Sequence, residues 1–183
     1  MKVLAFSGSL RTGSWNEQLL ALAVKGLVTR GLEVDAWSFK AANVPIYDPD
    51  TSDTNPAAGV VDFKARVRAA TGLLIACPEY NSSYPGALKN LFDAASRPPK
   101  ENPFRGKVTA QLGATNGPGG TLQAQVMLRH VLSGLGCLTL PGAFTVSRFT
   151  EAVADGRLKE ETQQKNLDSF LDRFVDELKL RSR

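Results

Sequence analysis

The chain has 183 residues, of which 43% are hydrophobic and 22% charged, a balance typical of a globular protein that needs no disulfide or metal to support its core. Length and composition predict a single domain over residues 1–183, and no apolar run approaches the roughly 20 residues of a membrane span. The N-terminus enters a strand without a signal-peptide pattern, so we expect a cytoplasmic protein. The net charge of +4 is scattered, which favours a small anionic ligand over nucleic acid.

The first element is an apolar strand over residues 3–6, followed by a turn over residues 8–16 and an amphipathic helix. A strand-to-helix turn directs free amide N–H groups and the positive end of the helix dipole toward one point, where an anion is stabilised. Ser9, Arg11, Ser14 and Asn16 add hydroxyl, guanidinium and amide donors at that point. The turn has neither a Walker ending nor the third glycine of a dinucleotide fingerprint, so it predicts a cradle for one phosphate.

A second interpretation of this turn needs no ligand. Ser14 and Glu17 have the spacing of a capping box, in which the serine caps the helix and the glutamate reaches back to it. For Ser14 alone both interpretations stay open. The four polar residues together exceed what a cap requires.

The next elements are a strand over residues 32–39, a long proline-rich connection over residues 41–56, and a helix over residues 57–70. Ile46 and Tyr47 could pin the connection to the core, and we assign it no chemistry. Residues 73–77 then form a continuous apolar run, which is typical of a central parallel strand covered on both faces.

An aromatic and polar loop over residues 78–86 follows that central strand and leads into a helix. A fourth strand is predicted over residues 107–112, and a glycine-rich turn over residues 113–120 follows it. Ligands of open α/β sheets bind outside the carboxyl ends of the strands, so these turns and residues 8–16 should share one crevice.

The last elements are a helix over residues 122–135, a fifth strand over residues 137–140, and a closing amphipathic helix over residues 158–180. Whether the fifth strand continues past residues 141–142 is left open. Alternating strands and helices predict an α/β fold with a doubly wound parallel sheet, right-handed crossovers and helices on both faces.

Three turns of different character therefore meet at the strand ends: a monophosphate cradle, a planar aromatic and polar loop, and a glycine-rich wall. A ligand with one phosphate and a broad, partly apolar ring would fit them. FMN has that shape, and the flavodoxin-like order 2-1-3-4-5 of a five-stranded sheet places FMN at such a point.

Few other residues offer chemistry of their own. Cys77 and Cys137 border apolar runs, which predicts buried thiols and no disulfide framework. His130 lies in a predicted helix without metal-ligating neighbours, so we interpret it as satisfied or solvated. The sequence shows no nucleophile–base pair and no metal site, and we therefore predict no catalytic side chain and no metal.

Several motifs recur in a known family. The family motifs are Gly8-Ser9-Leu10-Arg11 with Ser14 and Asn16, Pro78-Glu79-Tyr80-Asn81, Pro85-Gly86, Leu88-Lys89-Asn90, Asp93 and Ser96-Arg97-Pro98. Together they closely resemble the NADPH-dependent FMN reductase family, whose members include quinone, chromate and azo reductases. The resemblance spans nearly the whole chain.

The resemblance implies a set of cofactor-binding residues. The FMN phosphate would be bound by Ser9, Arg11, Ser14 and Asn16. The isoalloxazine ring would lie along Pro78, Glu79, Tyr80, Asn81 and Ser82, with backbone amides toward its N5 and O4 edge. Glu79 and Tyr80 would be ring neighbours or subunit contacts. Relatives often carry serine at the positions of Gly113 and Ala114, so any flavin contact at Ala114 would have to use the backbone.

The resemblance also implies the activity: hydride transfer from NADPH or NADH through flavin N5 to a quinone or a similar small acceptor, by a ping-pong mechanism. It implies a homodimer or homotetramer with each flavin near a subunit boundary. Two other functions stay open. One is a flavodoxin-type electron carrier without turnover of its own, which a pI near 9.2 disfavours because such carriers present an acidic face. The other is an interaction or nucleotide-sensing module without flavin.

Overall fold

The central feature of the fold is one parallel sheet, seen in a computed structural model that describes residues 1–181. Its main strands are β1 (Lys2–Ser7), β2 (Glu33–Trp37), β3 (Gly72–Ala76) and β4 (Val108–Ala114). The order is β2-β1-β3-β4-β5, and every neighbouring pair is parallel. The predicted flavodoxin-like order is thus confirmed.

The fifth position of the sheet holds two short strands, β5 (Leu138–Thr139) and β6 (Phe144–Val146), both paired with β4. Pro141 lacks the amide proton that a ladder needs, and Gly142 adopts a φ of +74° that an extended strand does not. The chain therefore leaves the sheet after β5 and rejoins it at β6, so the single predicted strand over residues 137–140 is corrected to two.

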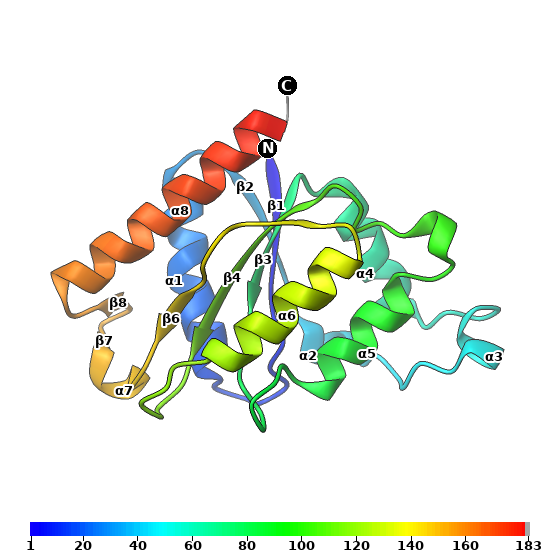
Figure 1. Cartoon of the computed structure of the whole chain (residues 1–183), viewed down its shortest axis with the longest axis horizontal. Helices are drawn as coiled ribbons and strands as arrows, with labels where there is room; N and C mark the ends of the chain where they lie inside the picture. The colour runs from blue at the N-terminus through cyan, green and yellow to red at the C-terminus, as the bar shows by residue number, and fades with distance from the viewer. Residues whose placement is uncertain (182–183) are drawn as a thin grey trace.

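Helices cover both faces of the sheet, as Figure 1 shows. One face is covered by α1 (Trp15–Thr29) and α8 (Glu161–Arg181), and the other by α4 (Ala58–Ala69), α5 (Gly86–Ala95) and α6 (Leu122–Gly134). Side chains of a strand alternate between the faces, so Val3 and Ala5 of β1 join the first core, whereas Leu4 and Phe6 join the second. The two cores explain why the central strands are apolar throughout.

The connection over residues 41–56 contains the single-turn helix α3 (Pro49–Ser52), and a second single-turn helix, α2 (Phe39–Ala42), begins before it and runs into it. The expected second strand stops at Trp37 because Ser38 caps α2. Ile46 does not pin the connection, because it is 82% exposed. Asn90 of α5 holds it instead: its Oδ1 accepts the Tyr47 amide at 2.7 Å, and its Nδ2 donates to the Pro45 carbonyl at 2.7 Å.

The end of the chain differs from its prediction in one respect. A short hairpin of β7 (Val153–Ala154) and β8 (Arg157–Leu158) follows the single-turn helix α7 (Phe149–Ala152), and the closing helix begins only at Glu161. Leu158 is buried in the core from the hairpin instead of from the helix. Among residues 1–181, no helix is both long and apolar enough to cross a membrane.

The two cysteines are free and buried, which confirms the expected thiols. Burial raises the pKa of both, that of Cys137 to about 12, so both thiols stay protonated at neutral pH.

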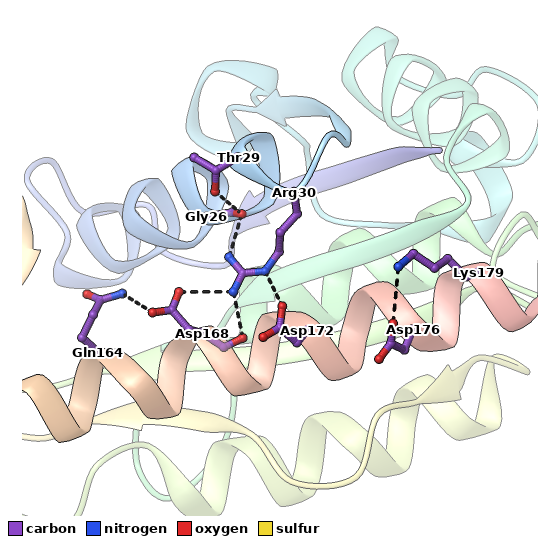
Figure 2. Close-up of polar contacts among 8 residues, drawn as sticks. All are labelled: Gly26, Thr29, Arg30, Gln164, Asp168, Asp172, Asp176 and Lys179. Carbon is purple, nitrogen blue, oxygen red and sulfur yellow. Dashed lines mark hydrogen bonds and ion pairs between the residues drawn. The ribbon is translucent and has the colours of Figure 1, made fainter.

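An arginine joins the first helix to the last (Figure 2). Arg30, at the end of α1, donates from Nε to Asp172 at 2.7 Å and from Nη2 to the carbonyl and carboxylate of Asp168. Its Nη1 also caps α1 through the Gly26 carbonyl at 2.9 Å. The helices approach closely here, because a Cβ on Gly26 would lie 2.5 Å from Leu171 Cδ1. The hydrogen bond from Arg30 lowers the pKa of Asp172.

We expect Arg30→Ala to lower the free energy of unfolding by about 1–2 kcal/mol, because it removes several charge-assisted hydrogen bonds at once. The pKa of Asp172 is depressed in the folded state, so the difference from wild type should be constant at neutral pH and shrink as the pH falls below about 4. Urea unfolding across pH measures it. Lys165→Ala, which breaks an exposed pair with Glu161, is the control and should cost less than about 0.5 kcal/mol. Equal losses in both variants would contradict the assignment.

Candidate functional site

A cavity opens where the carboxyl ends of β1, β3 and β4 meet. These strand ends lie at the lower edge of the sheet in Figure 1. It is lined by Ser9, Arg11, Ser14, Trp15, Asn16, Pro78, Glu79, Tyr80, Ala114 and Thr115. All but two of the predicted site residues therefore lie together around one space, and the expectation of a shared crevice is met. Asn81 and Ser82 lie outside this lining, whereas Trp15 and Thr115 are additions that the sequence argument missed.

Two buried serines shape the turn after β1. Ser9 and Ser14 are each 2% exposed, and each hydroxyl oxygen accepts a backbone amide at 3.2 Å, from Arg11 and Asn16 respectively. Because these hydroxyls act as acceptors, their hydrogens are left to donate to a ligand. Ser14 is the N-cap of α1, as the capping interpretation expects, but within residues 1–181 Glu17 makes no return bond to it. Capping and ligand binding are compatible for this residue.

Arg11 is the cation of the turn. Its Nη2 donates to the Gly13 carbonyl at 3.3 Å, and its guanidinium carbon lies 4.4 Å from the centre of the Trp15 ring. The stacked indole holds the guanidinium by a cation–π contact without neutralising it. Within the described residues no acidic side chain forms an ion pair with Arg11. An aromatic residue directly after the N-cap is the signal that could have indicated Trp15.

Asn16 joins two walls of the cavity. It is 3% exposed, its Nδ2 donates to the Ala114 carbonyl at 2.9 Å, and its Oδ1 accepts the Ala114 amide at 2.9 Å. This pair of hydrogen bonds links the start of α1 to the end of β4, across 98 positions of sequence. The single N–H of Ala114 is therefore already donated, which limits the backbone contact that we expected from Ala114 to its carbonyl oxygen.

The loop after β3 is a tight hairpin. Tyr80 and Ser83 exchange hydrogen bonds, from Tyr80 N at 2.9 Å and from Ser83 N at 3.1 Å. The two residues between them, Asn81 and Ser82, have φ values of +50° and +61°, which is the left-handed geometry of a two-residue turn. Their side chains are exposed at its tip, which is why neither lines the cavity. The hairpin fixes the backbone of this wall.

Glu79 has a contact that the sequence did not predict. Its Oε2 accepts the Ala124 amide at 3.1 Å, in the first turn of α6. A carboxylate at this end of a helix is stabilised by the unpaired amides and by the helix dipole. Glu79 therefore ties the hairpin wall to α6, whereas the neighbouring Tyr80 is 49% exposed at the mouth of the cavity.

The third wall departs from the expected glycine-rich turn, because Gly113 and Ala114 still belong to β4. A Cβ on Gly113 would lie 2.5 Å from Gln125 Nε2 and 2.8 Å from the Cys77 carbonyl, so this position has no room for a serine. Gln125 is only 3% exposed, and its Nε2 donates to that carbonyl at 3.1 Å and to Thr121 Oγ1 at 2.8 Å. In this chain, polar groups of α6 fill the space beside the strand.

The donor set indicates the ligand class. At one end the cavity has uncommitted hydroxyl hydrogens, a guanidinium without an ion-pair partner and a helix N-terminus. At the other end it has a wall that includes Pro78 and Tyr80. These groups fit a phosphate monoester joined to a planar ring. In the part of the chain that the structure describes, no group of three or more His, Cys, Asp or Glu residues could hold a metal ion.

The sheet order, with the cavity between β1 and β3 where the crossovers turn to opposite faces, defines the class of flavodoxin-like proteins. A family model described as NADPH-dependent FMN reductase matches residues 1–151. The chain therefore belongs to the NADPH-dependent FMN reductase family, and it is an oxidoreductase of the kind that uses FMN and NAD(P)H.

Individual relatives agree with this membership. The chain is 42% identical, over 88% of its length and 86% of the other, to an NAD(P)H-dependent FMN reductase of Pseudomonas aeruginosa. It is 34% identical to a 2-hydroxy-1,4-benzoquinone reductase of a Burkholderia species, over 96% and 94% of the two chains. Among solved structures, FerB of Paracoccus denitrificans, a flavoenzyme NAD(P)H:(acceptor) oxidoreductase, has a TM-score of 0.86 at 32% identity, with 98% of both chains covered.

We expect Asn16→Ala to lower the free energy of unfolding by about 2 kcal/mol, because it leaves the buried N–H and carbonyl of Ala114 without their partner. Gln18→Ala is the matched control: it removes an exposed hydrogen bond to the same turn, at Gly13, and should change stability by less than about 0.5 kcal/mol. Urea unfolding with an unchanged m-value measures both. If Asn16→Ala unfolds at the wild-type urea concentration, the two walls do not depend on this contact.

Proposed function

We propose that this chain oxidises NADPH or NADH with bound FMN and passes the electrons to quinones or similar small acceptors. The observation that carries the proposal is one cavity, at the switch point of the sheet, that joins the donor-rich turn after β1 to the hairpin wall of Pro78 and Tyr80. The names of the relatives support the acceptor class, since two of them are reductases of a quinone or of FMN.

The cradle end would hold the phosphate. Ser9 and Ser14 would donate their hydroxyl hydrogens, and Arg11 would add a charge-assisted contact from the rim. Asn16, whose amide is bonded to Ala114, would act mainly by fixing the cradle against β4. This division of roles follows from which donors are already committed inside the protein.

The other end would hold the ring. Pro78 and Glu79 run along the cavity, and Tyr80 stands at its mouth. The Tyr80 amide is already donated to Ser83, so the amides that face the ring edge would come from Glu79, which lines the cavity, or from Asn81 and Ser82 in the fixed turn of the hairpin. Ala114 and Thr115 would close the far side. FMN, when bound, supplies the two-electron redox chemistry, which the residues of this site do not offer.

The chain's own part in the reaction would be to bind and orient the flavin and to leave its ring accessible to the hydride donor and the acceptor. Tyr80 stands half-exposed at the mouth of the cavity, so donor and acceptor would reach the ring through this one opening and would bind in turn. We therefore propose a ping-pong mechanism. We propose the whole chain as one FMN-binding domain, since α8 packs back on α1 through Arg30 and completes the first core.

Steady-state kinetics test this function. With purified protein, FMN, NADPH and a benzoquinone, we expect NADPH consumption that depends on the quinone, with parallel lines in double-reciprocal plots. Intersecting lines would overturn the ping-pong order. If NADPH is not consumed while the protein binds FMN, the electron-carrier function is correct instead, and a protein that binds no FMN at all supports the flavin-free module.

We also propose a homodimer or homotetramer, supported by an uncharged stripe on α6. Leu122, Val126 and Met127 are 58%, 61% and 46% exposed along one side of the helix. The only charged residue of α6, Arg129, donates to the carbonyls of Leu140 and Gly142. A face without charge allows two copies of a protein with a net charge of +4 to approach.

We expect Val126→Asp to lower the molar mass measured by light scattering, because it would bury a carboxylate between the copies. Val28→Asp, at a valine that is 55% exposed on the opposite face of the sheet, is the control and should leave the mass unchanged. An assembly that is unaffected by Val126→Asp would place the interface elsewhere.

A further inference from the structure

A second cation lies at the phosphate turn, although the sequence around residues 8–16 contains only Arg11. The ammonium of Lys40, in α2, donates to the hydroxyl of Thr12. We propose that Lys40 takes part in recognising a phosphate monoester at this turn, as a residue that sets specificity for the phosphorylated form of a ligand. The inference rests on the proposed function and adds a residue to its site.

The fold holds the backbone of Lys40 in place. Phe39, its neighbour, is 5% exposed and stacks on Trp37 with ring centres 5.9 Å apart and planes inclined by 17°. The Ser38 hydroxyl caps the same short helix through the Ala41 amide. A Cβ on Gly59 would clash with the Ala42 carbonyl, so α2 is pressed closely against α4. The buried Phe39 therefore fixes the backbone beside Lys40, and the exposed, flexible side chain of Lys40 extends from there to Thr12.

The charges at this turn are not balanced within the protein. Arg11 bonds to Gly13, and Lys40 bonds to Thr12, so two cations contact consecutive residues of one turn. Neither forms an ion pair with a carboxylate anywhere in residues 1–181. Glu17, the acidic residue nearest to Arg11 in sequence, pairs with neither cation, and Asp35, the one nearest to Lys40, pairs with Arg66. The positive end of α1 adds to the same potential. Like charges gathered in this way are unfavourable unless an anion joins them.

A phosphate monoester is the anion that fits this arrangement. It carries about 1.5 to 2 negative charges at neutral pH, more than one guanidinium neutralises. Two ligands of the proposed reaction carry this group: FMN on its ribityl chain and NADPH on a ribose. Riboflavin and NADH present the same reacting rings without it. Comparing FMN with riboflavin, and NADPH with NADH, isolates the contribution of each phosphate to binding. The comparison identifies which of the two phosphates Lys40 recognises.

The first experiment measures dissociation constants of FMN and riboflavin for the apo-protein by flavin fluorescence. If Lys40 faces the FMN phosphate, Lys40→Gln should weaken FMN binding about fivefold and riboflavin binding less than twofold. Lys40→Arg should retain most of the affinity. The FMN effect should shrink in 0.5 M NaCl, since the contact is exposed. Lys100→Gln is the control: an exposed lysine in the η1 turn (Pro99–Glu101), with the same change of net charge. Arg11→Ala is the positive reference. It removes the cation of the turn, so it should lower the affinity for FMN more than it lowers the stability of the fold.

The second experiment measures kcat/KM for NADPH and NADH with the FMN-loaded protein. If Lys40 faces the ribose phosphate, Lys40→Gln should lower the NADPH/NADH ratio about fivefold while FMN affinity stays unchanged. The two experiments thus distinguish the two sources of phosphate. Thermal melting of each variant verifies that it folds, and an exposed lysine whose bond is to a surface hydroxyl should change the melting temperature little.

The proposal is overturned if Lys40→Gln equals Lys100→Gln in both experiments, or if it weakens riboflavin as much as FMN, which would indicate a general effect on the site. A wild-type protein that neither binds FMN nor oxidises NADPH would instead overturn the proposed function. The two failures are therefore distinguishable.

Discussion

The double hydrogen bond between Asn16 and Ala114 is the contact on which the cavity depends. β1 and β4 are not neighbours in the sheet, because β3 lies between them, and the turn after β1 could otherwise vary in its distance from the end of β4. Two bonds of 2.9 Å from one buried amide fix that distance. Glu79 makes the second such link, from the hairpin wall to α6. The three walls are thereby held to one another before any ligand arrives, which reduces the ordering that binding would require.

Much of this arrangement could be predicted from the sequence, because it depends on local signals. Apolar runs of strand length, helical stripes and the polar turn at residues 8–16 are each contained within a few residues of sequence. Parallel strands then bring their carboxyl ends to one edge, so Ser9, Pro78 and Ala114 could be placed together without coordinates. The strand order needed more, and it came from the shape of the ligand and from the resemblance to a known family.

What could not be predicted depends on contacts between distant segments. No pattern near Glu79 indicates that its carboxylate binds α6, and nothing near Asn90 indicates that it holds the connection at Tyr47. Lys40 reaches Thr12 only because Phe39 is buried beside Trp37. The break between β5 and β6 could have been predicted more firmly, since Pro141 and Gly142 are both unfavourable in a strand.

The position of Cys77 has a consequence for the durability of the protein. Its sulfur is fully buried at the end of β3, directly before the wall of the cavity, and burial keeps it protonated because it raises the thiol pKa. Quinones are electrophiles that arylate accessible thiolates, and only the deprotonated sulfur reacts readily. A protein that handles quinones, as proposed here, would therefore keep the thiol nearest to the reaction in a buried, protonated form that the substrate cannot attack. The same shielding of Cys137 leaves no exposed cysteine thiol among residues 1–181.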